Sequence, residues 1–439
     1  MIRELGDGLI LRRATVDDTE KLVAFHAAIH SQDGVQAPDE RVGAWTRDLM
    51  AGTHPIFQPD DFTIVEDTGR GEIVSSLCMI SQTWTYDGIP FGVGQPELVG
   101  TNPDYRRRGL IRAQFEVIHG WSAERGELVQ GITGIPNYYR QFGYEMGLAL
   151  GGGRLGYRPL VQKLEDGQAE PYRVRPALPS DLPFIARVYE GASRRWRVAC
   201  ARSDALWRYE LEGKGERSVQ RVNLCVVEAA AGQAVGLLAH MCMVERGRLF
   251  VTAYELAPGV SWLAVTPSVL RHLWATGDAI AARDGKELDA VALWLGAEHP
   301  VYPVIRERLP LARPPYAWYV RVADLPAFLR HIAPALERRL AESAAAGHTG
   351  ELKISFYGAG VRLAFEGGRL VTAGPWTPTQ EAQGGPAFPD LTFLQLLFGY
   401  RSLEELRYAF PDCGTGGDEP RVLLEALFPK QPSCVWHVT

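Results

Sequence analysis

Lysine is scarce in this chain of 439 residues, and no sign of charge dominates. The only lysines are Lys21, Lys163, Lys214, Lys286, Lys353 and Lys430, so arginine carries most of the positive charge. The 52 acidic residues outnumber the 46 lysines and arginines, which gives a formal net charge of −6. This balance argues against broad binding to nucleic acid or to a membrane surface, and leaves room for one local basic site.

Cysteine motifs and long apolar runs are also missing. The six cysteines are scattered, without a Cys-x-x-Cys pair or a cysteine and histidine at zinc spacing. We therefore expect reduced thiols, no metal site and a cytoplasmic protein. No apolar run approaches the roughly 18 residues that a membrane helix needs, and the first residues do not resemble a signal peptide. We expect no membrane partner.

The length and the 46% of hydrophobic residues predict two to four folded domains. Apolar periodicity and turn residues predict a first group of elements in the order strand, helix, then four strands. The strands are expected at residues 9–13, 62–66, 73–85, 89–93 and 97–101, with the helix at about 19–29. Asp87-Gly88 is a typical hairpin turn between two of these strands.

The same order recurs about 160 residues later. A strand at 172–177 and a helix near 180–189 precede strands at 223–228, 234–244 and 248–256 and a helix at 267–283. A third region is expected to hold a helix at 326–346, three short strands and two helices, the last with Ser402 as its cap. These patterns predict an α+β or α/β fold with mixed, mostly antiparallel sheets and flanking helices.

The segment with the clearest chemistry is Arg106-Arg107-Arg108-Gly109, which follows a strand ending at Thr101 and opens a helix. Such a turn directs backbone N–H groups and the positive end of a helix dipole to one place. With three arginines beside it, this place is suited to a diphosphate. A solvated helix start is the alternative interpretation of the same residues.

Here the sequence resembles the GNAT acyltransferase superfamily, whose pyrophosphate loop has the pattern Q/R-x-x-G-x-G/A. Arg106, Gly109 and Ile111 occupy the fixed positions, with Ile111 in place of the usual Gly or Ala. Downstream, Tyr138-Tyr139-Arg140-Gln141-Phe142-Gly143-Tyr144 looks like a second GNAT motif, in which a tyrosine lies beside the acyl thioester. One helix and one strand fit between the two motifs, as this fold requires.

The order of modules is similar to that of Eis-like acetyltransferases. The resemblance implies a catalytic GNAT domain at 1–155, a degenerate GNAT-like domain at 156–320 and a sterol-carrier-protein-like domain at 321–439. It also implies a homo-oligomer, a hexamer in the family. The second domain is expected to lack cofactor function, because Ala257-Pro258-Gly259-Val260-Ser261-Trp262 has no arginine where a phosphate loop would lie.

The resemblance also implies acetyl-CoA as the acyl donor, used as a substrate, and no metal. The residues expected to bind it are Val99, Gly100, Thr101, Arg106, Arg107, Arg108, Gly109, Leu110, Ile111 and Asn137. Asp33 and Glu40, in the stretch that corresponds to the acceptor-side loop of GNAT folds, are proposed to attract a cationic amine.

For catalysis, the resemblance implies Tyr139 as the general acid that protonates the departing thiolate. The base that receives the amine proton is left open between the terminal carboxylate of Thr439, Glu97 and water. The sequence thus predicts an acetyl-CoA-dependent N-acetyltransferase acting on an amine of a small molecule or a lysine side chain. The alternative is a non-catalytic protein that binds or senses acyl-CoA or lipid.

Overall fold

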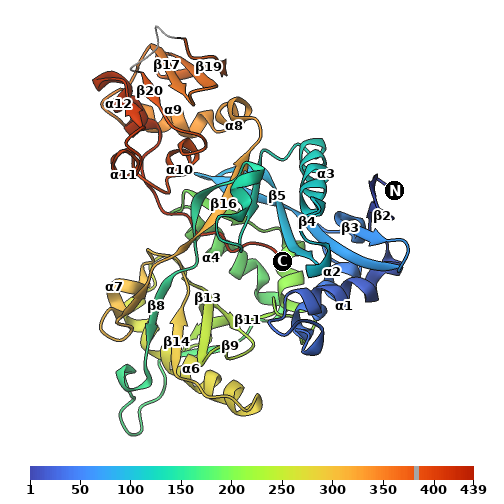
Figure 1. Ribbon diagram of the computed structural model, residues 1–439. Helices are drawn as coiled ribbons and strands as arrows, with labels where there is room; N and C mark the ends of the chain where they lie inside the picture. Colours follow the sequence, from blue (N-terminus) through green and yellow to red (C-terminus); the bar gives the residue numbers. More distant parts are fainter. Residues whose placement is uncertain (380–384) are drawn as a thin grey trace.

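The computed structural model describes residues 1–379 and 385–439. It has the mixed α+β architecture predicted from sequence, with helices packed on three sheets (Figure 1). We use first, second and third region for the predicted spans 1–155, 156–320 and 321–439. In the described residues no helix is both long and apolar enough to cross a membrane.

The first region holds β1 (Arg3–Gly6), β2 (Leu9–Arg13), α1 (Thr19–Ile29), α2 (Glu40–Met50), β3 (Phe62–Asp67), β4 (Glu72–Tyr86), β5 (Ile89–Thr101), α3 (Leu110–Glu124), β6 (Val129–Ile132) and β7 (Glu145–Leu150). Strands β1 to β5 form an antiparallel meander, and β6 then lies parallel to β5. The prediction of two strands at 89–93 and 97–101 is wrong in one respect, because these residues belong to the single strand β5. Its backbone changes direction at Leu98, where φ is +53° and the register with β4 shifts.

Strand β8 (Gly153–Gly156) lies at the boundary, with three of its four residues in the first region. The second region holds β9 (Tyr172–Pro176), α4 (Leu182–Ser193), β10 (Val198–Ala201), α5 (Asp204–Arg208), β11 (Val222–Ala229), β12 (Ala234–Met241), β13 (Arg248–Leu256), α6 (Trp262–Arg283), β14 (Ala290–Leu293), α7 (Val301–Ile305), β15 (Leu311–Arg313) and β16 (Tyr316–Val322). Strands β9, β11, β12 and β13 repeat the antiparallel order of the first sheet, and β14 again lies parallel to its neighbour β13. Helix α6 begins five residues before the predicted position 267 and contains Pro267.

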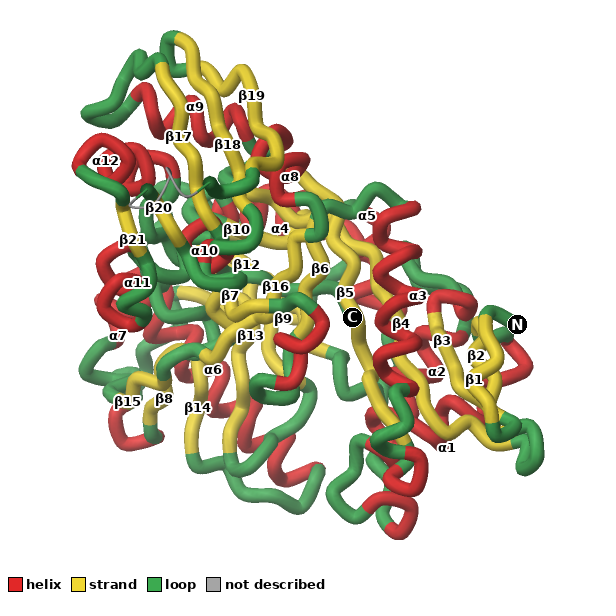
Figure 2. The backbone as a smooth tube through the Cα atoms, turned by 45° about the horizontal axis from the view of Figure 1, so that its top comes forward, coloured by secondary structure: helices red, strands yellow, loops and turns green. Residues whose placement is uncertain are grey.

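Two strands cross between these sheets. Strand β16 lies between β6 and β7 in the first sheet, whereas β8 lies between β14 and β15 in the second (Figure 2). Strand β10 also joins the first sheet, against the outer half of β4. Sequence patterns did not reveal this exchange, since they identify a strand without its partner. The first and second regions are therefore bound together by main-chain hydrogen bonds.

The third region holds α8 (Leu325–His331), α9 (Ala333–Ala341), β17 (Gly350–Ser355), β18 (Gly360–Glu366), β19 (Arg369–Trp376), β20 (Pro386–Ala387), α10 (Phe393–Leu397), α11 (Leu403–Ala409), β21 (Gly414–Thr415) and α12 (Asp418–Leu427). The helix predicted at 326–346 is wrong in length: it is divided into α8 and α9 at Ile332, just before Pro334. Ser402 caps α11 as predicted, with Glu405 completing the capping box.

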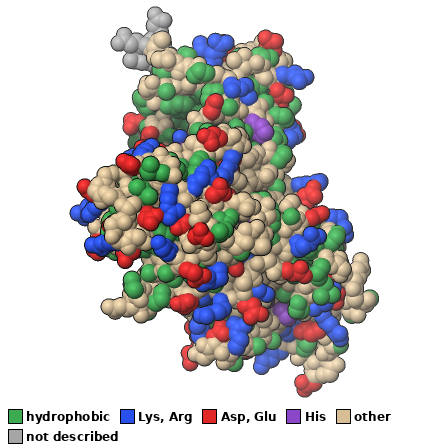
Figure 3. Space-filling model, turned by 90° about the vertical axis from the view of Figure 1, so that its right-hand side faces the viewer, with side chains coloured by type: hydrophobic (Ala, Val, Ile, Leu, Met, Phe, Trp, Pro, Cys, Tyr) green, Lys and Arg blue, Asp and Glu red, His purple; other side chains and the backbone are tan. Residues whose placement is uncertain are grey.

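A single apolar core joins the third region to the first sheet. It combines Trp84 and Trp318 of the first sheet with Phe328 of α8 and Phe398 after α10, all of them buried. After α12 the chain returns to the centre of the molecule, where the C-terminus lies close to α2, β4 and β5 (Figure 1). Acidic and basic side chains are intermingled on the face in Figure 3, rather than gathered into one basic surface.

Candidate active site

A cavity of about 1040 Å³ lies where β5 and β6 separate. These parallel strands pair only at Val93 with Val129 and at Gly94 with Gln130. Beyond these pairs they diverge, so residues 96–101 form one wall and residues 132–135 form another. The open edge of β5 can therefore accept an extended ligand in place of a neighbouring strand.

One end of the cavity is the start of α3. Gly109 is the N-cap, with φ of +74°, and no side chain caps the helix. Glycine adopts this left-handed conformation at a lower steric cost than other residues. Without a capping side chain, the first N–H groups of α3 remain available to an anion.

Arginines surround these N–H groups. Arg106 and Arg107 line the cavity, and Arg112 does so from the first turn of α3. In the part of the chain that the structure describes, neither Arg106 nor Arg107 forms an ion pair, whereas Arg112 donates to Gln141 at 2.9 Å. Arg108 turns toward the ring of Tyr105 and is not a lining residue. Two exposed guanidinium groups thus stand free beside an uncapped helix start.

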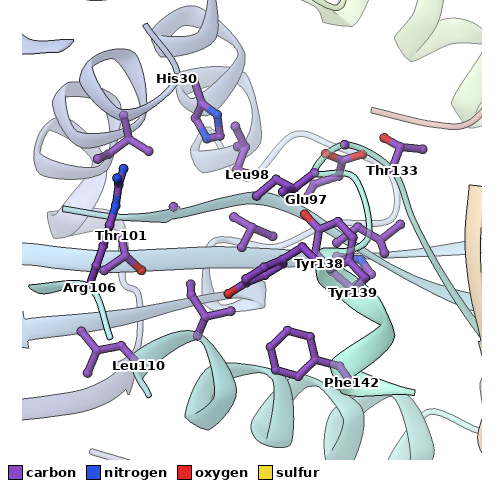
Figure 4. A pocket seen from close by; sticks show the side chains of 18 of the residues that line it. His30, Glu97, Leu98, Thr101, Arg106, Leu110, Thr133, Tyr138, Tyr139 and Phe142 are labelled. Carbon is purple, nitrogen blue, oxygen red and sulfur yellow. The ribbon is translucent and has the colours of Figure 1, made fainter. Parts of the chain in front are cut away.

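At the other end lie Glu97 and Tyr139, which face the same cavity with Tyr138 and Thr133 (Figure 4). Glu97 follows Pro96 on β5, next to the change of direction at Leu98. Burial raises the pKa of the Glu97 carboxyl to about 7, against the hydrogen bonds from Gln95 and the Leu98 backbone, which lower it. This carboxyl can therefore take or give a proton near neutral pH.

Tyr139 lies on the short helix η5 (Tyr138–Phe142) and is 2% exposed. Its ring packs on Phe115, Tyr144 and Tyr319, and Tyr319 comes from the exchanged strand β16. Burial, and then the charge of Glu97, raise the pKa of the Tyr139 hydroxyl above its usual value. The hydroxyl is therefore protonated at neutral pH.

Most of the residues predicted to bind the donor come together here. Those that line the cavity are Val99, Gly100, Thr101, Arg106, Arg107, Gly109, Leu110 and Ile111, together with the predicted catalytic residues Glu97 and Tyr139. Asn137 is exposed and donates its backbone N–H to the Tyr319 hydroxyl at 2.7 Å; it does not line the cavity. Asp33 and Glu40 are exposed and lie outside the lining residues.

Thr439 is also absent from the lining residues. It is buried, and its hydroxyl accepts a hydrogen bond from Lys214 at 3.3 Å. Val438, one residue earlier, is bound to Gln82 on β4. The C-terminal residues therefore reach β4 of the first region but do not line the cavity.

Several lining residues were not identified as site residues from sequence. His30, Val42 and Trp45 come from α2 and the end of α1, and Val219 and Gln220 come from the second region. Trp45 belongs to the predicted acceptor-side stretch, which was the available signal. Val219 and Gln220 had none, because only the folded arrangement brings their loop to the first region.

The comparisons with known proteins agree with this geometry. Residues 11–147 match the family described as acetyltransferase (GNAT) domain. A search of curated protein sequences found no significant match. Among solved structures, the fold is similar to a probable N-acyltransferase from Enterococcus faecalis V583, with a TM-score of 0.67 and 12% identity over 98% of this chain and 99% of that one.

Two further structures share this fold. A GCN5-related N-acetyltransferase from Kribbella flavida has a TM-score of 0.62 and 19% identity, and 98% of each chain is covered. Eis1 from Mycobacterium abscessus has a TM-score of 0.58 and 15% identity, over 96% of this chain and 98% of that one. At these identities the likeness concerns the fold. The family match places a GNAT acetyltransferase domain at residues 11–147.

Proposed function

We propose that this protein is an acetyl-CoA-dependent N-acetyltransferase that transfers the acetyl group directly to an amine. The observation that carries the proposal is the single cavity in which an uncapped helix start, the open edge of β5, Glu97 and Tyr139 meet. An anion site, a strand edge, a base and an acid are the parts that direct acyl transfer from a thioester requires.

The donor end is supported by the chemistry of its residues. The N–H groups at the start of α3 and the guanidinium groups of Arg106 and Arg107 suit a diphosphate, which takes hydrogen bonds and two or more positive charges. Val99, Gly100 and Thr101 offer a strand edge to an extended chain that carries amide groups. Backbone groups serve well because the fold already fixes them.

Glu97 is the base we propose for the amine. An alkylammonium must lose a proton before its nitrogen attacks, and a carboxylate with a pKa of about 7 accepts that proton at neutral pH. Thr439, the other residue predicted as a base, is tested beside it by removing Thr439 alone, which keeps Val438 and its contact with Gln82. Water remains the third option, and only loss of activity in a Glu97 or Thr439 variant would displace it.

Tyr139 is the acid we propose for the leaving group. Its hydroxyl forms no hydrogen bond with any other described residue, so it is available to a ligand in the cavity. A protonated phenol beside the thioester sulfur can donate as the carbon–sulfur bond breaks. The thiol then leaves as a neutral group, and the amide product keeps the acetyl carbon.

The acceptor is proposed to be a small-molecule amine or a lysine side chain. Glu97 is the only acidic side chain among the residues that line the cavity, beside His30 and aromatic residues such as Trp45. Asp33 and Glu40 remain proposed as outer groups that attract a cation toward the opening. They lie exposed around α2 and the loop before it.

The finer organisation is proposed as well. The repeated strand order supports a degenerate GNAT-like domain at 156–320, followed by a sterol-carrier-like domain at 321–439. The six free cysteines suit a cytoplasmic location. A homo-oligomer, a hexamer by resemblance, can be tested by measuring the mass in solution.

Acetyl-CoA turnover with a panel of amines tests the function. Release of free thiol that depends on an amine supports the acetyltransferase. If acetyl-CoA binds tightly and no amine releases thiol, the alternative of an acyl-CoA binding or sensing protein replaces it.

A further inference from the structure

Two buried glutamines connect the C-terminal residues to Glu97. Gln82 lies on β4 and Gln95 on β5, and they are 5% and 0% exposed. Gln82 donates to the Gln95 oxygen at 2.5 Å, and Gln95 donates to Oε1 of Glu97 at 2.6 Å. The chain of hydrogen bonds therefore ends on the carboxyl group that faces the cavity.

Trp84 fixes the direction of this chain. The indole N–H can only donate, and it donates to Oε1 of Gln82 at 3.2 Å. The amide nitrogen of Gln82 must then face the other way, toward the oxygen of Gln95. In turn, the amide nitrogen of Gln95 must face Glu97. Because of this order, Glu97 receives a hydrogen bond and is not asked to donate one.

Val438, next to the C-terminus, forms two hydrogen bonds with Gln82. The N–H of Val438 donates to Oε1 of Gln82 at 3.1 Å, and the Val438 carbonyl accepts from Nε2 of Gln82 at 3.0 Å. Both ends of one side-chain amide are thus bound by one residue. This pair of bonds favours the same orientation of Gln82 that Trp84 requires.

The second region holds this segment in place. Arg202 donates to the carbonyls of Trp436 and His437, each at 3.1 Å, and stacks on the Trp436 ring. Glu210 pairs with Arg202 and with Lys214, and all three side chains are buried. The position of Val438 is therefore set by residues that do not line the cavity.

We propose that Gln82 and Gln95 are positioning residues that couple the docked segment 436–439 to Glu97, and hold its carboxylate as an acceptor facing the cavity. This inference rests on the proposed function, in which Glu97 is the base. Segment 436–439 then acts through its main chain and needs no chemistry of its own. An active site in the first region is completed by residues from the end of the third.

Other titratable side chains lie near Glu97 or line the same cavity. Cys78 lies opposite it on β4, Tyr139 faces it from η5, and His30 lines the same cavity from the end of α1. Burial raises the pKa of the Cys78 thiol, and the Tyr139 hydroxyl is protonated at neutral pH, so both are neutral there. Among these neighbours, Gln95 is the one that donates a side-chain hydrogen bond to Glu97.

The test is a titration of Glu97 in the full-length protein by carboxyl ¹³C NMR, with Glu97→Gln to identify its signal. Gln95→Met keeps the volume and removes the donor, so we expect the pKa of Glu97 to rise by about one unit. Val438→Pro removes the N–H that binds Gln82, and we expect a smaller rise. Gln130→Leu is the matched control, because Gln130 is an equally buried amide bound to Ser122 and Arg321, and it should leave the Glu97 titration unchanged.

An unchanged pKa in folded Gln95→Met would overturn the positioning role. A rise in Gln95→Met with none in Val438→Pro would overturn the coupling to the C-terminal segment. Because the titration needs no turnover, it decides this inference separately from the function. Absence of thiol release from the wild-type protein with every amine would count against the proposed function alone.

Discussion

The first and second sheets share an order of strands and differ wherever the first sheet builds its cavity. Parallel strands β5 and β6 pair at two positions and then separate, whereas β13 and β14 stay paired at four positions from Arg248 to Val251. Beyond those pairs, the end of β13 and the residues after β14 line a cavity of only about 30 Å³, together with Cys434 and Trp436. The shared topology provides a scaffold, and local pairing decides whether a site exists on it.

The helices that follow β5 and β13 show the same contrast. Helix α3 begins at Gly109 without a side-chain cap, and helix α6 begins at Ser261, whose hydroxyl accepts from the Ala264 N–H. The side chain of Ser261 thus takes a hydrogen bond that an anion would otherwise receive. No arginine lies at the start of α6.

The polar residues of the two sheets also differ in what they bind. Glu255, near the end of β13, forms an ion pair with Arg195 and a hydrogen bond with His299, whereas Glu97 near the end of β5 has only amide partners among the described residues. Tyr302, after β14, donates to the Gly296 carbonyl at 2.9 Å, whereas the Tyr139 hydroxyl is free to meet a ligand. In the second sheet equivalent groups stabilise the fold, and in the first they remain available for chemistry.

The largest effect is expected from Tyr139→Phe. Loss of the proposed acid should lower turnover by about 100-fold or more, because general acid catalysis is worth at least that factor. Binding of acetyl-CoA should change little, since the ring keeps its packing. Thiol release and isothermal titration calorimetry measure the two quantities.

Tyr302→Phe is the matched control from the second region. It removes a hydroxyl that is bound to backbone carbonyls, so it should lower stability and leave turnover intact. Equal turnover in the wild type and Tyr139→Phe would remove Tyr139 from the mechanism and with it the contrast between the two tyrosines.

Glu97→Gln should lower kcat/KM by about 100-fold near neutral pH. In the wild type the proton-accepting form is the carboxylate, and its pKa is about 7. The rate should therefore fall as the pH drops below about 7, and this acid limb should disappear in the variant. Rates measured from pH 5.5 to 8.5 provide the test.

Glu255→Gln serves as the control, since Glu255 is the carboxylate paired with Arg195. It should keep the acid limb of the wild type. An acid limb that persists in Glu97→Gln would assign the proton to another group, and loss of activity on removing Thr439 alone would then point to Thr439.

Arg106→Ala and Arg107→Ala should each weaken acetyl-CoA binding by about tenfold, as expected for a charge-assisted hydrogen bond to phosphate. The difference from wild type should shrink as salt is added, because these side chains are exposed. Arg187→Ala, an exposed arginine on α4, should have no effect. Equal affinities in all variants would place the diphosphate elsewhere.

The smallest effect is expected at the second helix start. Ser261→Ala removes the cap of α6 and should lower the free energy of unfolding by about 1 kcal/mol. Acetyl-CoA affinity should not change, because that helix start takes no part in binding. Urea denaturation measures the stability, and calorimetry measures the affinity for acetyl-CoA. Weaker binding of acetyl-CoA to this variant would show that the second region takes part in binding the donor.

The sequence predicted much of this structure because its signals are local. The turn at Asp87-Gly88, the cap at Ser402 and the basic helix start at Gly109 each depend on a few neighbouring residues, and each is found where expected. Tyr139 and Glu97 could be selected as site residues because they lie in or beside the two motifs that resemble those of GNAT enzymes, and both line the cavity. Features that depend on neighbouring residues in this way can be predicted from a single sequence.

What was missed depends on pairing between distant segments. Strand β16 was not predicted, and nothing in its residues indicates that it lies between β6 and β7. Gln82 and Gln95 look like polar residues on strands until folding brings Val438 to them. Gln220 reaches the cavity for the same reason. Long-range contacts of this kind need the fold.

The central claim is that the cavity of the first region transfers acetyl directly from acetyl-CoA to an amine. The most direct measurement is free thiol released with and without an amine acceptor, at enzyme concentrations comparable to acetyl-CoA. We predict no stoichiometric thiol release without an amine, and one thiol for each amide formed when it is present. A burst of one thiol per enzyme in the absence of amine would indicate an acetylated protein and contradict direct transfer.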